Sequence, residues 1–317
     1  MQDQQFDTRM IVRRSKLYVP VNREKYVVKA WTRGADCIIL DLEDSIAPAD
    51  KAPARKLVKD VIPVVKKGGA DVLVRINREF EEQDLDAVIE EGLSGIMIPK
   101  CEFSEDIERI DDLVTQLEKE RALPAGKIQF DLIFETAQGI INVEQVARAS
   151  SRIVSITTGQ ADLSVDLGFT RFSELNFEQY FYAENKLLYA ARAAKIQPHG
   201  IGAQSNVDFT SISMGQEAML KACRHAFWMG YMGTSVIHPD WIQAANEGFT
   251  PPREEVELAR KVKAALKEAY ARGRGSVSVE GRMYDVANMK HVDYLLARAE
   301  AIEKREAEKA AALEAVK

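Results

Sequence analysis

Residues 130–162 read FDLIFETAQGIINVEQVARASSRIVSITTGQAD, and this stretch decides which fold we expect for the chain. Two short runs rich in β-branched and aromatic residues, 130–134 and 153–158, are typical of buried parallel strands, and a helix-prone run separates them. A carboxylate follows each run, Glu135 after the first and Asp162 after the second. Adjacent parallel strands lie about 5 Å apart, so side chains at matching ends can share one hard cation. The alternative is two acids in surface loops, where Asp and Glu are common. We favour the metal site, because loops that follow barrel strands often carry functional residues.

Composition narrows the class of protein. The chain has 317 residues, 46% hydrophobic and 29% charged, which fits one large α/β domain with an appendage. A net charge of −6 without a basic block argues against nucleic acid as the main partner. Cys37, Cys101 and Cys223 are far apart and form no CxxC pair, which favours a reducing compartment, the cytoplasm. We expect no membrane partner, because the N-terminal segment lacks the apolar core of a signal peptide and no run approaches spanning length.

The rest of the chain repeats the pattern of residues 130–162. Eight short β-branched runs, mostly alternating with helical segments, lie within about the first 248 residues. Polar residues stand at or just past the ends of these runs: Tyr18, Asp41, Glu43, Arg75, Lys100, Glu135, Asp162, His199 and His238. We therefore predict a (β/α)₈ TIM barrel as the catalytic domain over residues 1–248, with an active site at the rim where the strands end. An open doubly wound sheet is the alternative.

Residues 249–317 are expected to form a C-terminal helical extension that packs on a neighbouring subunit. Pro251 and Pro252 mark the break, and a helix is predicted over 253–272. Residues 276–284 alternate like a strand or hairpin, and 289–302 reads as a second helix. The Ala-, Glu- and Lys-rich tail after Glu303 is expected to be a frayed, solvated helix.

Several charged residues near the strand ends have two interpretations. The sequence Asp41-Leu42-Glu43-Asp44 is either a polar loop or a second shell that binds metal-bound water, and we favour the latter. Arg75 ends a buried strand, so it needs an ion-pair partner in that loop, and it is also suited to clamp a carboxylate or enolate oxygen. Tyr18, Arg23 and Lys29 lie in and after the first loop, where a basic pair is either solvated or holds ligand phosphates.

The chain resembles a known family through a series of short motifs in a fixed order. They are Leu17-Tyr18-Val19-Pro20 with Arg23, Leu40-Asp41-Leu42-Glu43-Asp44-Ser45, Val74-Arg75-Ile76-Asn77, Pro99-Lys100, Phe134-Glu135-Thr136-Ala137, Gly159-Gln160-Ala161-Asp162, Ile237-His238-Pro239 and Gly281-Arg282-Met283-Tyr284-Asp285. Together they resemble the citrate lyase β-subunit-like family, a branch of the HpcH/HpaI aldolase superfamily, from Arg14 to about Arg298. The segment after Asp162 and the last motif are most similar to malyl-CoA and citramalyl-CoA lyases.

This resemblance implies a TIM-barrel enzyme that uses Mg²⁺, with Mn²⁺ as an alternative, and coenzyme A as part of its substrate. The implied reaction is reversible cleavage of a 3-hydroxyacyl-CoA of malyl-, methylmalyl- or citramalyl-CoA type. The products would be acetyl-CoA or propionyl-CoA and a 2-oxo acid, glyoxylate or pyruvate. The implied enzyme class is that of oxo-acid carbon–carbon lyases.

The resemblance also implies roles for individual residues. Glu135 and Asp162 would be the metal ligands, and Asp285 would be the acid/base, delivered from the appendage of a neighbouring subunit in a homotrimer or hexamer. Arg75 would bind substrate oxygens. The remaining implied contacts are Tyr18, Arg23 and Lys29 with coenzyme A, and Ala161, Ile237 and His238 lining the substrate pocket.

One position departs from the pattern of many relatives. They carry an Asp-Gly pair after strand seven, where this chain has His199 and Gly200, followed by residues 201–206. We expect His199 to change the charge of the pocket and therefore the acyl-CoA or 2-oxo acid accepted. A thioesterase acting on the same esters and a non-catalytic barrel subunit are the alternative functions.

Overall fold

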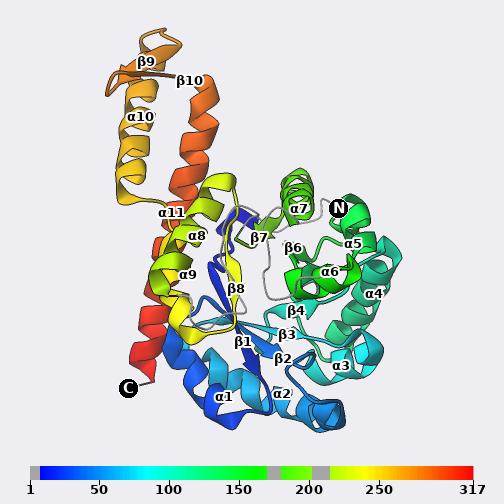
Figure 1. The fold of residues 1–317 in the computed structure, drawn as a ribbon. Helices are drawn as coiled ribbons and strands as arrows, with labels where there is room; N and C mark the ends of the chain where they lie inside the picture. The colour runs from blue at the N-terminus through cyan, green and yellow to red at the C-terminus, as the bar shows by residue number, and fades with distance from the viewer. Residues whose placement is uncertain (1–7, 170–179, 202–214, 317) are drawn as a thin grey trace. The chain divides into compact units, whose positions relative to one another are not determined.

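Eight parallel strands form a nearly closed barrel in the computed structural model, which describes residues 8–169, 180–201 and 215–316 (Figure 1). The strands are β1 Ser15–Pro20, β2 Cys37–Asp41, β3 Asp71–Arg75, β4 Gly95–Ile98, β5 Gln129–Phe134, β6 Ile153–Thr158, β7 Gln197–His199 and β8 Thr234–Val236. Their order is β7-β6-β5-β4-β3-β2-β1-β8, with each neighbouring pair parallel. The predicted TIM barrel is confirmed, and the open doubly wound sheet is not observed.

Backbone hydrogen bonds connect the two end strands, β7 and β8, although the pair forms no regular ladder. The N–H of Met232 donates to the carbonyl of Pro198 at 3.0 Å, and the N–H of Gly200 donates to that of Gly233 at 2.8 Å. Parallel strands that close in this way present all their carboxyl ends at one rim. The barrel therefore brings the polar strand-end residues to one face.

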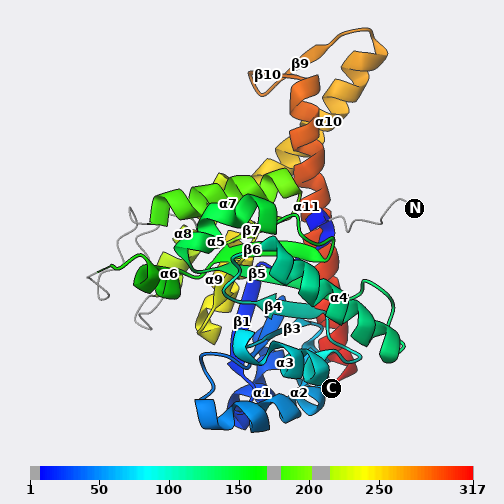
Figure 2. The same ribbon diagram turned by 90° about the vertical axis from the view of Figure 1, so that its right-hand side faces the viewer.

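Helices surround the strands (Figure 2). They are α1 Glu24–Ala30, α2 Lys51–Val65, α3 Glu81–Val88, α4 Ser104–Glu120, α5 Ala137–Val146, α6 Gln160–Asp166, α7 Phe181–Ala194, α8 Gln216–Met229 and α9 Ile242–Gly248. Within the part of the chain that the structure describes, no helix is both long and apolar enough to cross a membrane.

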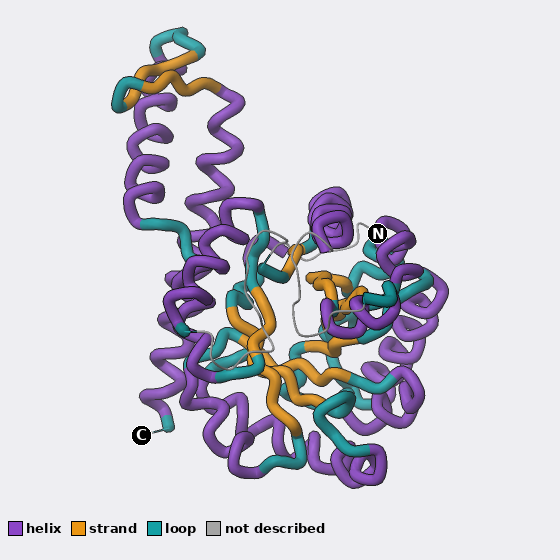
Figure 3. Tube along the Cα trace, viewed as in Figure 1, coloured by secondary structure: helices purple, strands orange, loops and turns teal. Residues whose placement is uncertain are grey.

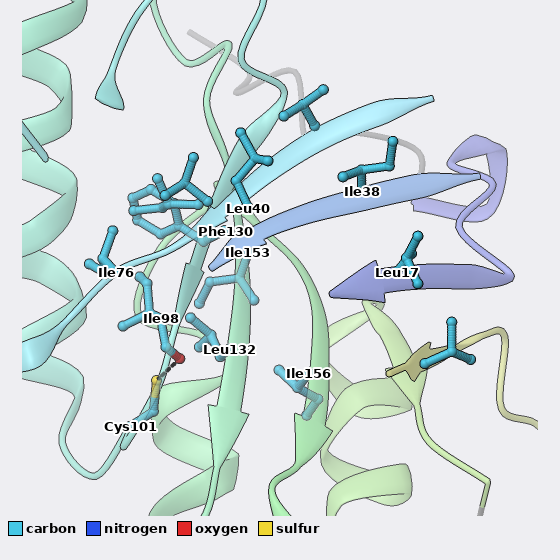
Figure 4. Packing of buried hydrophobic residues seen from close by; sticks show 14 of the residues in the cluster. Leu17, Ile38, Leu40, Ile76, Ile98, Cys101, Phe130, Leu132, Ile153 and Ile156 are labelled. Carbon is cyan, nitrogen blue, oxygen red and sulfur yellow. Dashed lines mark hydrogen bonds between the residues drawn. The ribbon is translucent and has the colours of Figure 1, made fainter. Parts of the chain in front are cut away.

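Alternate strand residues face two different layers. Outward residues such as Ile38, Leu40 and Phe130 are fully buried in the large core between strands and helices, part of which is drawn in Figure 4. Inward residues such as Ile39 and Met97 form a smaller apolar cluster inside the barrel. This alternation places every second strand residue, including the polar ones, in the barrel interior.

Buried ion pairs fill the N-terminal end of the barrel, which the sequence analysis did not anticipate. Lys16 Nζ in β1 lies 2.6 Å from Asp131 Oδ2 in β5, and both side chains are inaccessible to solvent. Arg13 Nε donates to Asp71 Oδ2 at 2.8 Å at the start of β3. Each of these cations has an acidic partner, so the buried charges at this end of the barrel are paired.

The chain divides into two compact units, and the second contains residues 9–12 and 250–308. In it, α10 Arg253–Ala271 and α11 Val286–Ala315 are connected by an antiparallel hairpin, β9 Ser276–Val279 and β10 Arg282–Asp285 (Figure 3). The core of this unit is formed by Ala259, Val262, Leu266 and Val292.

The first unit contains residues 13–249 and also the chain from Lys309 onward, whereas we had placed everything after residue 248 in the extension. The expectation of a frayed, solvated tail is wrong. The helix α11 continues to Ala315, and Lys309 is buried with its Nζ 2.7 Å from Asp36 Oδ1. Arg14 contacts the same carboxylate, with Nε 2.7 Å from Oδ2, so the tail is fixed by a shared buried anion.

Candidate functional site

A cavity of about 300 Å³ opens at the carboxyl ends of the strands. Its wall includes residues of β1, the last residue of β3, the loops after β2 and β5, the end of β6 with the start of α6, and the region of β8. The predicted site residues Tyr18, Arg75, Glu135, Asp162 and Ile237 line it, together with Asp44 and Ala161. The strands thus gather into one cavity residues that are far apart in the sequence.

Arg75 is held by the acidic loop that follows β2. Its Nε and Nη2 donate to the two carboxylate oxygens of Asp41 at 2.7 and 2.8 Å. Its Nη1 lies 2.8 Å from Glu43 Oε2 and 3.0 Å from Asp44 Oδ2. The guanidinium also lies 4.9 Å from the centre of the Tyr18 ring. The predicted ion pair between Arg75 and this loop is therefore confirmed.

Asp41 does not line the cavity, and its contacts hold neighbouring residues in place. Besides its two bonds to Arg75, its oxygens accept the N–H groups of Glu43 at 3.0 Å and Ser45 at 3.1 Å. Burial alone would raise the pKa of Asp41, but the hydrogen bonds and charge of Arg75 lower it below its ordinary value. Asp41 stays ionised and fixes both Arg75 and the loop that carries Asp44.

Glu135 is buried just after β5, with 4% of its surface exposed. Its Oε1 accepts the N–H of Lys100 at 3.0 Å, and Lys100 Nζ lies 3.3 Å from Glu43 Oε1. Burial, followed by the negative charges of Glu43 and Asp162, raises the pKa of Glu135 to about 8. A cation placed between these carboxylates would remove that repulsion.

Gly159 explains how Glu135 fits beside the loop after β6. A Cβ atom at Gly159 would lie only 2.3 Å from Glu135 Oε2 and 2.7 Å from Glu135 Cβ. The glycine therefore lets the carboxylate lie directly against the backbone that leads into α6. Asp162 is in the first turn of that helix and lines the same cavity, so the expected pair of carboxylates does come together.

The donor set suits a hard divalent cation. Mg²⁺ prefers oxygen ligands and is usually bound by one or two carboxylates together with water and ligand oxygens. Glu135 and Asp162 provide two such carboxylates. Within residues 8–169, 180–201 and 215–316, no group of three His, Cys, Asp or Glu side chains is arranged to hold an ion.

Other predicted residues lie outside the cavity lining. Arg23 and Lys29 are exposed, Arg23 just before α1 and Lys29 in its last turn. His238 Nδ1 accepts the N–H of Asp240 at 3.3 Å and so begins a short 3₁₀ helix, while its neighbour Ile237 lines the cavity.

The expectation that His199 would change the pocket charge is wrong for the described residues. His199 is fully buried in β7, its Nε2 lies 3.0 Å from Gln197 Oε1, and it is not part of the cavity wall. The next residues, Gly200 and Ile201, line the cavity instead. Residues 202–206, which continue that segment, lie outside the described part of the chain.

Asp285 belongs to the second unit, where it ends β10. Its N–H donates to Asn288 Oδ1 and its Oδ1 accepts the N–H of Ala287, both at 2.9 Å. These contacts cap the start of α11. The role of Asp285 as an acid/base stays a prediction.

The sequence analysis missed Glu184, which lines the cavity from the first turn of α7. Its Oε1 accepts from Gln160 Nε2 and its Oε2 from the hydroxyl of Tyr231, both at 3.0 Å. Burial raises the pKa of Glu184, and these hydrogen bonds oppose the rise. An acid early in a helix is so common that the sequence offers no signal for this role.

Glu135 and Glu184 share a second property. Of the buried Asp and Glu side chains in the described part of the chain, these two alone form no ion pair with Lys or Arg. The paired ones are Asp36, Asp41, Glu43, Glu81, Asp84, Glu118 and Asp131. Both exceptions face the cavity, where a ligand can supply what the protein does not.

Comparisons with known proteins agree with the sequence motifs. The family model described as HpcH/HpaI aldolase/citrate lyase matches residues 14–239. The chain is 33% identical to citrate lyase subunit beta of Leuconostoc mesenteroides subsp. cremoris, over 86% of this chain and 89% of the relative. It is 32% identical to L-malyl-CoA/beta-methylmalyl-CoA lyase of Cereibacter sphaeroides, over 91% of this chain and 95% of the relative.

Solved structures share the fold. Protein CitE of Mycobacterium tuberculosis, in complex with magnesium, acetoacetate and coenzyme A, has a TM-score of 0.67 and 24% identity, covering 92% of this chain and 99% of that one. A citrate lyase of Burkholderia xenovorans has a TM-score of 0.77 and 18% identity, covering 92% and 93%. The chain therefore belongs to the HpcH/HpaI aldolase/citrate lyase family and, like these lyase relatives, is a carbon–carbon lyase.

Proposed function

We propose that this lyase is Mg²⁺-dependent and reversibly cleaves a 3-hydroxyacyl-CoA into an acyl-CoA and a 2-oxo acid. The substrate is of malyl-, methylmalyl- or citramalyl-CoA type. The products are acetyl-CoA or propionyl-CoA and glyoxylate or pyruvate. The observation that carries the proposal is the cavity in which Glu135 and Asp162, neither of which forms an ion pair with a described Lys or Arg, face the same space as Arg75.

The relatives support the substrate class. One relative, from Cereibacter sphaeroides, is an L-malyl-CoA/beta-methylmalyl-CoA lyase. The CitE structures hold magnesium together with acetoacetate and coenzyme A in one case and pyruvate in another. Each of these combines a divalent cation with a small oxo acid, which fits the two carboxylates of this cavity.

The chain's own residues divide the chemistry. Glu135 and Asp162 would hold the cation, which when bound supplies a Lewis acid that polarises the carbonyl of a 2-oxo acid. Arg75 donates three hydrogen bonds, two to Asp41 and one to Asp44, and its Nη1 also forms an ion pair with Glu43. The second N–H of Nη2 makes none of these contacts, and it would donate to a ligand oxygen and stabilise the negative charge on the thioester oxygen in the transition state.

Asp285 would transfer the proton. In the direction of condensation, its carboxylate takes a proton from the carbon next to the thioester carbonyl, and the resulting enolate forms a carbon–carbon bond with the 2-oxo carbonyl. The new alkoxide then takes up a proton, and cleavage is the reverse. We propose that Asp285 comes from a neighbouring subunit of a homo-oligomer, a trimer or hexamer, and that Tyr18, Arg23 and Lys29 contact coenzyme A.

The first test is an assay of malyl-CoA and citramalyl-CoA with Mg²⁺ and with a chelator. Release of a 2-oxo acid that stops on chelation supports the lyase. Free thiol with an intact hydroxy acid would instead identify a thioesterase. No turnover of any acyl-CoA would favour a non-catalytic subunit.

The second test concerns Asp285. Asp285→Asn should abolish turnover while Mg²⁺ binding, measured by calorimetry, is retained. Co-expression of Asp285→Asn with Glu135→Gln should restore part of the activity, because mixed oligomers would contain sites with both functional residues. No recovery in mixed oligomers would contradict a contribution from the neighbouring subunit, and an active Asp285→Asn variant would contradict the acid/base role itself.

A further inference from the structure

Glu184 is a buried acid that the proposed reaction does not use. Only 2% of its surface is exposed, and in the described part of the chain it forms no ion pair. A buried carboxylate without a cation destabilises a fold, so its presence in a cavity wall points to a role toward the ligand.

Burial raises the pKa of the Glu184 carboxyl group, and its hydrogen bonds act in the opposite direction, toward the ionised form. Both oxygens accept, Oε1 from the amide of Gln160 and Oε2 from the hydroxyl of Tyr231. Donors to both oxygens stabilise a carboxylate relative to the neutral acid. The same bonds hold the side chain in one place, at the edge of the cavity beside Gly200, whose Cβ would lie 3.4 Å from Glu184 Oε2.

Glu184 lies close to the carboxylates proposed to bind the cation. Its partner Gln160 follows Gly159, which contacts Glu135, and precedes Asp162 by two residues. All three acids line the same cavity of about 300 Å³. A small ligand chelated there would therefore have Glu184 as a close neighbour.

The positive charges of the cavity are already matched. A divalent cation would be balanced by Glu135 and Asp162, and Arg75 is balanced by the loop after β2. The carboxylate that every 2-oxo acid carries would bind the cation, but a second carboxylate would meet Glu184, and Arg75 is the only Lys or Arg among the described residues that line the cavity. Like charges in a partly desolvated cavity repel strongly.

We propose that Glu184 is a specificity residue that selects against a second carboxylate, so that the enzyme accepts 2-oxo monocarboxylates and rejects 2-oxo dicarboxylates. This inference rests on the proposed lyase function and deepens it. It separates the two kinds of relative, because an oxo acid such as pyruvate fits beside Glu184 and one such as oxaloacetate does not. Rejection by a placed like charge is a common route to specificity.

The test compares pyruvate with oxaloacetate on the Mg²⁺-loaded protein. Kd is measured by calorimetry, and kcat/KM for condensation with acetyl-CoA is measured in parallel. We expect wild type to prefer pyruvate, and Glu184→Gln, which keeps the shape but removes the charge, to lower the Kd ratio of oxaloacetate to pyruvate by about 10-fold or more. Glu144→Gln, on the exposed face of α5, is the matched control and should leave the ratio unchanged.

A purely structural role for Glu184 would change both affinities by the same factor and leave the ratio unaltered, which would overturn the inference. If wild type neither binds pyruvate nor releases a 2-oxo acid from any ester, the proposed function and the inference fail together. If wild type is an active lyase and the ratio does not respond, only the inference fails.

A second measurement needs no variant. The 4-methyl ester of oxaloacetate carries its extra carbon atoms without the second charge. Wild type should bind this ester about 10-fold or more tightly than oxaloacetate. Equal binding of the two compounds would show that size rather than charge sets the preference and would overturn the inference.

Discussion

The two ends of the barrel differ in how their buried charges are paired. At the N-terminal end, Lys16 pairs with Asp131, and Arg14 and Lys309 share Asp36. At the C-terminal end, Glu135 and Glu184 have no ion-pair partner in the described part of the chain and face a cavity. These side chains are buried at both ends, so burial alone does not explain the difference.

Unpaired buried charge is costly, and it persists where a ligand supplies the missing interaction. Paired charge needs no ligand, and it fixes the shape of the barrel. In such barrels the C-terminal face carries the chemistry and the N-terminal face carries stability. We therefore expect substitutions at the C-terminal face to change activity with little loss of stability. Substitutions at the N-terminal face should lower stability with little change in activity.

The largest effect is expected at Glu135. Glu135→Gln removes a proposed cation ligand, so lyase kcat/KM should fall by about 10⁴-fold, which corresponds to about 5 kcal/mol. Thermal stability of the metal-free protein, measured above pH 8 where Glu135 is ionised, should stay equal or rise, because the substitution removes one of several like charges from the cavity. Steady-state kinetics and Tm measure the two quantities, and Glu144→Gln serves as control. An active Glu135→Gln variant, or one that is inactive only because it unfolds, would contradict the proposal that buried charge at the C-terminal end serves activity and not stability.

At Lys16 we expect the opposite result, a loss of stability without a loss of activity. Lys16→Met leaves Asp131 buried without a cation, which should lower the free energy of unfolding by about 3–5 kcal/mol. The double variant Lys16→Met with Asp131→Leu should recover most of this loss, because an apolar pair can replace a buried ion pair. Denaturant unfolding measures stability, and kcat per folded molecule at low temperature should stay within about two-fold of wild type. A loss of activity without a loss of stability would place Lys16 in the chemistry instead.

The carboxylate of Asp36 gives the paired end a pH dependence. Burial would raise its pKa, but Arg14 and Lys309 lower it to about 2, below the ordinary value of 3.8. A depressed acid pKa stabilises the fold above pH 3.8, and this contribution, about 2 kcal/mol, is lost as the pH falls through 2. The stability difference between wild type and Asp36→Asn should therefore be full at pH 7 and shrink below pH 4. The exposed Asp60→Asn is the control, and a difference independent of pH would contradict the pairing.

Sequence patterns predict the barrel and the metal pair for a definite reason. Strand runs of β-branched residues give the order of elements, and the closure of parallel strands then brings Glu135 and Asp162 to one rim. Glu184 could not be found in this way, because its burial depends on Tyr231, 47 residues away. The packed tail was missed for the same reason, since Lys309 is buried through contacts with Asp36 and the carbonyl of Gly34, and an Ala-, Glu- and Lys-rich helix has the same composition when solvated.

The smallest effect is expected at Gly159, where one substitution tests whether a contact affects Mg²⁺ binding or the stability of the fold. Gly159→Ala would place a Cβ atom 2.3 Å from Glu135 Oε2, so the carboxylate must move. We expect Mg²⁺ affinity and kcat/KM to fall by about 10-fold, since displacing a ligand group by a fraction of an ångström is costly to a site that depends on position. Gly275→Ala, where nothing lies within 4 Å of the added atom, is the control. A Gly159→Ala variant that loses stability while keeping its Mg²⁺ affinity would show that this contact stabilises the fold. The C-terminal end would then resemble the N-terminal end, where buried contacts contribute to stability.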